Sequence, residues 1–431
     1  MAQLKDDCFA FGGELTPLAD ALAILSDRVR PVAGPEIVSL RHAAGRILAE
    51  DIIADRDVPP HDNSAVDGYA VYFDDLDPDG ETRLKVTGRI AAGHPLGRPA
   101  EKGEAFRIFT GAPMPVGTDG TQASGPDTVF MEEDCEADGE EDGDSVILPA
   151  GLKRGSNRRN AGEDVEKGSV VVEAGRRLRA QEVGVAASVG RSEVAVYRPL
   201  RAAVFSTGDE VRDPGGDAPE GCIFDANRYA VIALLEGLGA EVTDFGILED
   251  DTEAISGALK DAAPGHDLLV TSGGVSAGEE DHVRDAVENL GKIHFWRLAI
   301  KPGRPIALGQ VGDVAFLGLP GNPVAAMVTF MVIGRPLVLL LSGMAEVTRP
   351  RFPVEAGFDY KKKPGRREWA RVKLESNGDG RPVAMKCHSS GAGILTSMVE
   401  ADGLVELPED TEALEKGAMI DFLPFNEVTG R

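Results

Sequence analysis

Three turns rich in glycine or proline directly follow predicted strands, and their residue types suit a bound phosphate. Paired glycines that lead into a helix present backbone N–H groups and a positive helix end, and both attract anions. A single turn of this kind is weak evidence, since many are purely structural. Three of them at strand ends of one domain predict a ligand site. The candidate binding residues are Ser206, Thr207, Gly208 and Asp209; Ser272, Gly273, Gly274, Val275, Ser276 and Gly278; and Pro320, Gly321, Asn322 and Pro323.

Carboxylates accompany these turns. Glu210, Asp250 and Asp281 each lie just past an apolar strand or a glycine loop. Because carboxylates repel phosphate, their convergence at a phosphate site requires a cation between them. Mg²⁺ is held in this way by one or two carboxylates and phosphate oxygens, so we predict a magnesium site. For each residue the alternative is an acid that caps a helix or occupies its first turn.

A short basic segment and two polar clusters are further candidates. Arg297 and Lys301 are four residues apart and would face the same way on one strand, which predicts an anion site. A solvated edge is the alternative, although the flanking residues are apolar. The polar clusters lie at 62–70, which contains Asp67, and at 160–164, which contains Asp164. Each cluster is also compatible with a simple turn held by Asx hydrogen bonds.

The segments that position these residues show three kinds of sequence pattern. Residues 201–343 alternate apolar strands with amphipathic helices, which predicts a parallel sheet flanked by helices. Residues 64–149 are short alternating runs, typical of an inserted β-domain whose acidic segment 136–144 forms a hairpin tip. Residues 349–431 have β texture again. Near the N-terminus, Thr16 is placed to cap a helix that begins at Pro17, and 43–53 is a second amphipathic segment.

Composition excludes several classes of function. The chain carries 72 acidic and 45 basic residues, a net charge of −27, so a basic nucleic-acid-binding face is excluded for the chain as a whole. The four cysteines include no C-x-x-C pair, which leaves no zinc or iron–sulfur spacing. The longest apolar run, 324–341, contains Arg335 and Pro336 and is predicted to be a buried helix. The charged N-terminus lacks a signal peptide, so we expect a cytoplasmic protein without membrane contact.

Taken together, these segments resemble the molybdopterin molybdenumtransferase family, which includes the C-terminal domain of gephyrin. The resemblance covers nearly the whole chain. The TSGGVS loop alone would be less specific, because related cofactor-adenylylating and nucleotide-hydrolysing proteins share it. The resemblance rests on the segments 62–70, 110–113, 159–164, 205–210, 225–228, 271–281, 295–305, 319–324 and 363–366.

The resemblance implies a multidomain α/β plus β fold and a homodimer. Its core would be a three-layer, parallel-sheet α/β nucleotide-binding domain, accompanied by β-rich inserted and C-terminal barrel-like domains. The implied boundaries are 1–60 with 157–199 for the N-terminal linking domain, 61–156 for the inserted β-domain, 200–348 for the α/β molybdopterin-binding domain and 349–431 for the C-terminal β-barrel.

The implied activity is insertion of molybdate into adenylylated molybdopterin, with Mg²⁺-dependent release of AMP. These small molecules would be the substrates, and proteins of cofactor biosynthesis and molybdoenzymes the partners. The resemblance assigns Asp67, Thr110 and Asp164 to the dimer cleft and Arg366 to molybdate. It assigns the nucleotide, metal and phosphate roles to Glu210, Asp250, Asp281 and Lys301.

The chain departs from the family pattern at three of these places. Arg297 stands where lysine is usual, which keeps the charge but changes the geometry. Ala325 and Ala392 stand where serines are common, and Ser389 or Ser390 could replace the lost hydroxyls. The rival functions are a non-catalytic scaffold and a nucleotide pyrophosphatase that shares the α/β domain. A scaffold would not need Asp250, Asp281 and Lys301, and a pyrophosphatase would not need the inserted domain.

Overall fold

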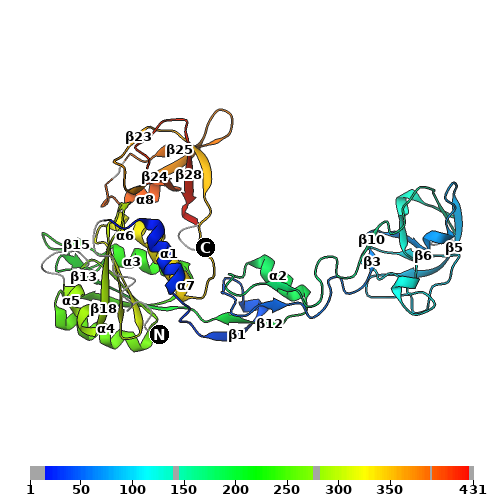
Figure 1. Ribbon diagram of the computed structural model, residues 1–431, viewed down its shortest axis with the longest axis horizontal. Helices are drawn as coiled ribbons and strands as arrows, with labels where there is room; N and C mark the ends of the chain where they lie inside the picture. The colour runs from blue at the N-terminus through cyan, green and yellow to red at the C-terminus, as the bar shows by residue number, and fades with distance from the viewer. Residues whose placement is uncertain (1–14, 139–144, 275–281, 389–390, 427–431) are drawn as a thin grey trace.

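The computed structural model describes residues 15–138, 145–274, 282–388 and 391–426. The molecule is elongated (Figure 1). An α/β domain and a C-terminal barrel lie together at one end, a small linking domain follows, and the inserted β-domain forms the far end. The multidomain α/β plus β class predicted from the sequence is confirmed.

The sheet of the α/β domain has the strand order β16-β13-β17-β21-β20-β18. The strands β13 (Arg201–Thr207), β16 (Glu241–Leu248), β17 (Leu268–Ser272) and β21 (Val314–Leu319) are parallel. The strands β18 (Gly291–Arg297) and β20 (Pro305–Val311) run antiparallel, so the expected all-parallel sheet is in fact mixed. The connections after β18 and β20 are too short for a crossover helix and therefore allow only antiparallel pairing.

Helices cover both faces of this sheet and make three layers. Alternate residues of a strand point to opposite faces. Thus Ala202 and Val204 of β13 pack with α1 (Leu18–Arg28), α3 (Asn227–Gly237) and the helix from α6 to α7, while Ala203 and Phe205 pack with α4 (Thr252–Ala262) and α5 (His282–Leu290). The first of these two cores also contains Trp369 and Met398 of the barrel, so the barrel and the α/β domain share buried apolar side chains.

The helix after Asn322 comprises α6 (Pro323–Thr329), a π-helical turn (Phe330–Gly334) and α7 (Arg335–Leu341). By length and composition, Pro323–Leu341 is the one helix of the described residues that could cross a membrane. However, 89% of its most apolar stretch is buried inside the protein. It is therefore the central core helix that the sequence predicted.

Two local expectations near the N-terminus are wrong. Thr16 does not cap α1, which begins at Leu18 without a side-chain cap. Instead, the backbone N–H of Thr16 donates to Arg297 O at 2.8 Å, and the carbonyl of Thr16 accepts from the Ala299 N–H at 2.7 Å. The chain pairs here with the end of β18 and the segment after it. The segment 43–53 is not helical either. Its side chains Ala43, Leu48 and Ile52 are buried in the small core of the linking domain, whereas Ile53, at the end of β2 (Ile52–Ile53), is exposed.

The linking domain joins segments from two parts of the chain. Its pairs are β1 (Pro35–Ser39) with β12 (Glu193–Tyr197) and β2 with β11 (Val170–Val172), and α2 (Ala180–Ser188) packs beside them. The paired strands β3 (Asn63–Ser64) and β10 (Arg158–Arg159) lead into the inserted domain. That domain contains one sheet of β7 (Thr128–Met131), β4 (Gly68–Val71), β6 (Glu104–Ile108), β5 (Thr82–Ile90), β9 (Ser145–Leu148) and β8 (Glu136–Asp138). The strands β8 and β9 pair antiparallel around the predicted hairpin tip, of which 139–144 lie outside the described residues.

The C-terminal domain is a closed barrel with α8 (Thr396–Glu400) beside it. Its strands are β24 (Arg367–Ser376), β25 (Pro382–Lys386), β22 (Phe352–Ala356), β28 (Met419–Pro424) and β26 (Gly403–Leu407). The barrel closes because β24 also pairs with β26. A two-residue strand of the α/β segment, β19 (Ile300–Lys301), adds to it by pairing parallel with β24. Lys301 is thereby attached to the barrel.

Candidate active site

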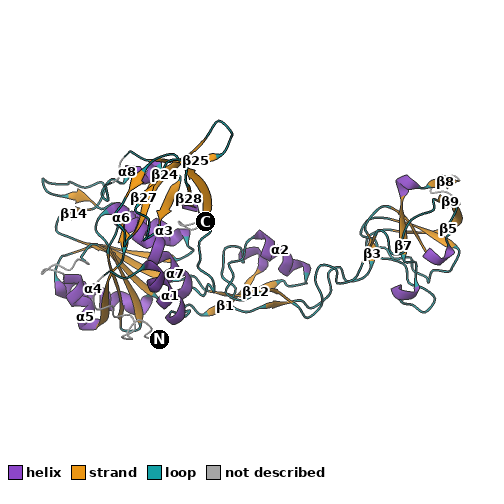
Figure 2. Cartoon of the chain, turned by 45° about the horizontal axis from the view of Figure 1, so that its top comes forward, coloured by secondary structure: helices purple, strands orange, loops and turns teal. Residues whose placement is uncertain are grey.

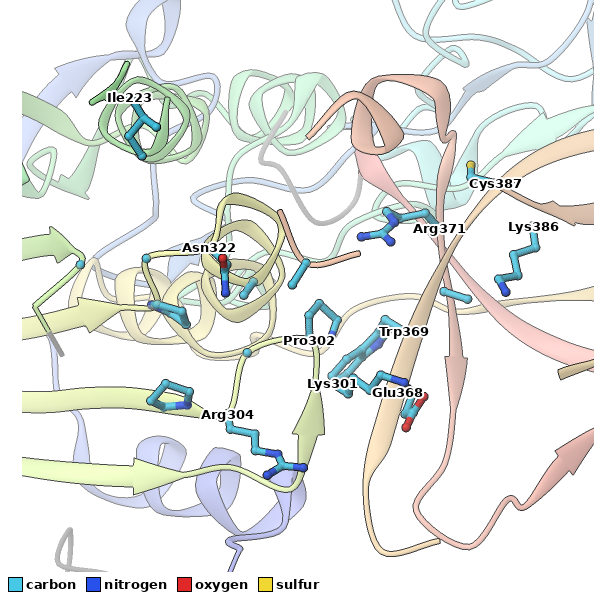
Figure 3. A pocket seen from close by; sticks show the side chains of 18 of the residues that line it. Ile223, Lys301, Pro302, Arg304, Asn322, Glu368, Trp369, Arg371, Lys386 and Cys387 are labelled. Carbon is cyan, nitrogen blue, oxygen red and sulfur yellow. Dashed lines mark hydrogen bonds and ion pairs between the residues drawn. The ribbon is translucent and has the colours of Figure 1, made fainter. Parts of the chain in front are cut away.

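A cavity of about 890 Å³ lies between the α/β domain and the barrel (Figure 3). One wall is made by the segments that follow β13, β17 and β21, at the carboxyl ends of the parallel strands, where open α/β sheets bind ligands. The opposite wall is made by barrel strands and by the loop after β19. The lining residues that the sequence had singled out are Glu210, Gly273, Gly274, Lys301, Pro320, Gly321 and Asn322, together with Ala325 and Ala392.

The glycine and proline turns are held together by Asn227 at the start of α3. Its Nδ2 donates to Ser272 Oγ at 2.8 Å and to Gly321 O at 2.7 Å. Ser272 Oγ in turn donates to Pro320 O at 3.2 Å. At Gly274, where φ is +62°, an added Cβ would lie 2.5 Å from Val283 Cγ2. Glycine is therefore required there, and the turns form one preorganised edge of the cavity.

Other predicted residues of these turns are structural or lie off the cavity. Ser206 and Thr207 are buried within β13, and the N–H of Gly273 already donates to Leu319 O at 3.2 Å. The remaining members of this group do not line the cavity: Gly208, Asp209 and Pro323, the last at the first position of α6. Val275, Ser276 and Gly278 lie outside the described residues.

Of the three predicted metal ligands, Glu210 lines the cavity and Asp250 does not. Asp281 lies outside the described residues. In the part of the chain that the structure describes, no group of three or more His, Cys, Asp or Glu side chains is arranged to hold a metal ion. A carboxylate beside the glycine turns is nevertheless compatible in chemistry with Mg²⁺, which takes one or two carboxylates and otherwise phosphate oxygens and water.

Arg297 and Lys301 do not share a strand, so the expectation that they face the same way is wrong. Arg297 ends β18 and is exposed off the cavity, whereas Lys301 belongs to β19 and lines it. The cause is that the chain leaves the α/β sheet after Arg297 and joins the barrel at Ile300. The ammonium of Lys301 lies 3.1 Å from Glu368 Oε2.

Barrel side chains that the sequence did not single out complete the cavity, and the positively charged ones are Arg371 and Lys386 (Figure 3). Arg371 is 7% exposed, and burial lowers the pKa of its guanidinium. Its Nη1 donates to Gly391 O at 3.4 Å. Arg366, the residue predicted to bind molybdate, lies before β24 and off the cavity. An arginine between apolar residues in the β-textured segment 349–431 was the available signal for Arg371.

The remaining barrel residues of the cavity wall are Tyr360, Glu368, Trp369, Ala370 and Cys387. Burial raises the pKa of the Cys387 thiol. Cys135, Cys222 and Cys387 are free, and Cys8 lies outside the described residues.

Asp67 and Thr110 are brought together at the other end of the molecule. Asp67 Oδ1 accepts the Thr110 backbone N–H at 2.7 Å and its hydroxyl at 2.8 Å, and these bonds lower the pKa of the carboxyl. Asp164 is exposed beside the linking domain. None of the three lines the cavity, and the inserted domain lies at the opposite end from the barrel (Figure 2). Within one chain, these residues and the cavity are therefore separate.

Part of each polar cluster has a structural role, although through contacts between the two clusters and not through an Asx turn. Asp62 Oδ1 accepts the Ala161 N–H at 2.7 Å, and Asp62 Oδ2 lies 3.3 Å from Arg158 Nη2. These contacts join the two clusters beside the β3–β10 pair. Asp67 and Asp164 take no part in them.

Gly68, next to Asp67, packs directly against β7. An added Cβ would lie 1.7 Å from Phe130 O, so Gly68→Ala must push β4 and β7 apart. We expect the free energy of unfolding to fall by about 1–3 kcal/mol, the usual cost of overpacking. Thermal unfolding measures this, with Gly184→Ala as control because its added Cβ meets nothing within 4 Å. Equal unfolding midpoints for the two variants would show that the strand contact is looser than described.

The glycine turns of the α/β domain and the cationic side chains of the barrel thus face each other across one candidate ligand site. Family models match the chain in order: the MoeA N-terminal region (domain I and II) at 16–190, a probable molybdopterin binding domain at 203–339 and the MoeA C-terminal region (domain IV) at 353–425. The chain belongs to the molybdopterin molybdenumtransferase family, as its motifs indicated. It is therefore a transferase of molybdenum cofactor biosynthesis.

Individual relatives match over most of their length. The molybdopterin molybdenumtransferase of Haemophilus influenzae is 38% identical over 92% of this chain and 95% of its own. That of a Nostoc species is 34% identical, over 86% and 85%. A crystal structure titled molybdopterin biosynthesis moeA protein, from Pyrococcus horikoshii, has a TM-score of 0.79 at 27% identity and covers 95% of this chain and 100% of that one.

Proposed function

We propose that this cavity inserts molybdate into adenylylated molybdopterin and releases AMP in a Mg²⁺-dependent reaction. The observation that carries the proposal is the pairing of two walls with different chemistry across one cavity. The α/β wall offers glycine turns and a carboxylate, which suit a nucleotide phosphate and its metal. The barrel wall offers fixed ammonium and guanidinium groups, which suit a small oxyanion. A cavity of about 890 Å³ is also in the range of sites for large small-molecule ligands.

The part of the cavity proposed to bind molybdate contains cationic side chains and the methyl groups of two alanines. Lys301 and Arg371 are placed to make charge-assisted contacts with molybdate, and Lys386 adds positive charge. We propose for Arg371 the role that the family resemblance assigns to Arg366, because Arg371 lines the cavity. Ala325 of α6 and Ala392 before α8 also line the cavity, and the two segments touch, since the Val324 N–H donates to Ala392 O at 3.0 Å.

In the proposed mechanism, the turns at Gly274 and Pro320–Asn322 hold the phosphates while Lys301 and Arg371 hold the oxyanion beside the pterin dithiolene. Both sets of groups are ordered before the reaction, so little reorganisation is needed as charge develops. Glu210, with Asp250 and Asp281 as further candidates, would hold Mg²⁺. When bound, this ion would neutralise charge on the phosphoanhydride and on the departing AMP.

We further propose that the protein is a homodimer whose clefts are each completed by the partner chain. The separation of Asp67, Thr110 and Asp164 from the cavity supports this, because residues of one chemistry would otherwise lie at opposite ends of the molecule. We place the protein in the cytoplasm, where it would work with proteins of cofactor biosynthesis and with molybdoenzymes. No interaction with nucleic acid or membrane is proposed.

The experiment is to incubate the protein with adenylylated molybdopterin, molybdate and Mg²⁺, and to assay AMP and finished cofactor. The proposal predicts that both appear together and only with molybdate present. A scaffold would produce neither, and a nucleotide pyrophosphatase would release AMP without molybdate and form no cofactor.

Serine at positions 325 and 392 is expected to strengthen molybdate use. A neutral hydrogen bond contributes about 0.5–1.5 kcal/mol net, so Ala325→Ser with Ala392→Ser should lower the half-saturating molybdate concentration roughly five- to a hundredfold if the effects add. Each single variant should give part of the effect, and AMP binding should stay unchanged because neither position is in the glycine turns. A double variant that needs as much molybdate as the parent would contradict this placement of the oxyanion.

A further inference from the structure

Glu368 is a buried carboxylate in the cavity wall at the junction between the barrel and β19. Its side chain is 2% exposed, and β24 places it directly opposite Lys301 in the β19–β24 register. Its Oε2 accepts from Lys301 Nζ at 3.1 Å and from the Tyr360 hydroxyl at 3.0 Å. One buried oxygen thus connects two side chains of the cavity wall that come from distant parts of the sequence.

Several contacts hold the Tyr360 side chain, which donates to Glu368, in place. Burial, with the hydrogen bond to Glu368 as a second cause, raises the pKa of Tyr360 to about 12, so the phenol remains a donor at any physiological pH. The ammonium of Lys386 lies 5.0 Å from the centroid of the Tyr360 ring, and Phe358 packs on the ring edge-on. Tyr360 therefore holds the Glu368 carboxylate in one position.

The Lys301 side faces the cavity. The side chain is 53% exposed, and its ammonium has three N–H donors, of which Glu368 takes one. The others can be directed at a ligand in the cavity. A free lysine side chain must lose rotamer freedom when it binds an anion, and this ordering weakens binding. A lysine already held by a buried carboxylate has lost that freedom before the anion arrives.

We propose that Glu368 is a positioning residue which, through Lys301, determines how strongly the cavity holds its inorganic oxyanion. This inference rests on the proposed function, since it takes the ligand of Lys301 to be the oxyanion. The negative charge of Glu368 also repels an anion. However, Glu368 contacts Lys301 directly and meets the anion only across it, so the positioning effect is the larger.

The first test is equilibrium dialysis with inorganic molybdate alone. Glu368→Gln keeps the length of the side chain and loses its charge, whereas Glu368→Asp keeps the charge and loses a methylene of reach. Positioning needs both properties, so both variants should bind molybdate about tenfold more weakly, the loss expected for one weakened charge-assisted contact. Unchanged or tighter binding by Glu368→Gln, or wild-type binding by Glu368→Asp, would overturn the proposal.

A double-mutant cycle separates positioning from a general loss of structure. If Glu368 acts through Lys301, then Glu368→Gln should change molybdate binding by less than about twofold in a Lys301→Met background. Equal losses in both backgrounds would overturn the proposal.

Glu406 provides the matched control for stability. It is equally buried in β26 and paired with Arg367 and the Trp369 indole, but it does not line the cavity. Glu406→Gln should lower the unfolding temperature and leave molybdate binding unchanged, and weakened binding here would show that Glu368 has no specific role. Failure of the wild type to bind molybdate would instead contradict the proposed function, whereas wild-type binding with unaltered Glu368 variants would contradict this inference alone.

Discussion

Two inactive variants should restore activity to each other when they are combined in one dimer. Asp67→Ala alters the inserted domain, and Glu210→Ala alters the cavity of the α/β domain. If each cleft takes its Asp67 from one chain and its Glu210 from the other, a heterodimer of the two variants contains one intact cleft. It should therefore form cofactor at about half the wild-type rate, while each parent is nearly inactive. Co-expression with two different tags and purification on both gives the heterodimer directly.

The reciprocal heterodimer is the control. A chain that carries both substitutions, paired with a wild-type chain, should be nearly inactive, because each cleft then contains one defect. A site formed within one chain predicts the reverse, with half activity for this dimer and none for the first. Light scattering should also give about twice the 45.5 kDa chain mass. A fully active monomer would contradict the shared cleft.

Removal of divalent metal should reduce AMP release about a thousandfold, since a metal ion that stabilises transition-state charge contributes several kcal/mol. Glu210→Ala should require more Mg²⁺ for half-maximal rate, because Glu210 is the predicted ligand that lines the cavity. The measurement is AMP release at a series of Mg²⁺ concentrations after treatment with chelator.

Asp209→Ala is the neighbouring control for this experiment. Asp209 does not line the cavity, so its substitution should leave the Mg²⁺ dependence unchanged. AMP release at the normal rate without divalent metal, or an identical Mg²⁺ dependence in Glu210→Ala, would contradict the metal assignment.

The strands under the cavity could be predicted because they are continuous apolar runs that end at glycine or proline. The pattern could not show that β18 and β20 are antiparallel, since direction depends on the connections and not on the strand itself. The same limit explains why the attachment of Lys301 to the barrel could not be predicted. A two-residue strand such as β19 is too short to show a period, and its partner β24 lies more than sixty residues along the chain.

More of the predicted site residues line the cavity on the α/β wall than on the barrel wall. Turns such as 318–323 have a local signature, so sequence alone identified them. Glu368 and Arg371 lie on β24 and Lys386 on the neighbouring β25, and only the packing of the barrel against the α/β domain brings them to the cavity. Asp67 and Thr110 were assigned to one cleft only through the family resemblance, and their direct contact was not predicted, because β4, β5 and β6 separate them in the sequence.

The proposed function requires that one cavity couples release of AMP to insertion of molybdenum. The most direct test is a single turnover with stoichiometric adenylylated molybdopterin, isotopically labelled molybdate and Mg²⁺, in which released AMP and pterin-bound label are measured at the same times. The account predicts that the two appear at the same rate and in equal amounts, and that Lys301→Met slows both together. AMP released at an undiminished rate in the absence of molybdate, with no label transferred to the pterin, would contradict it.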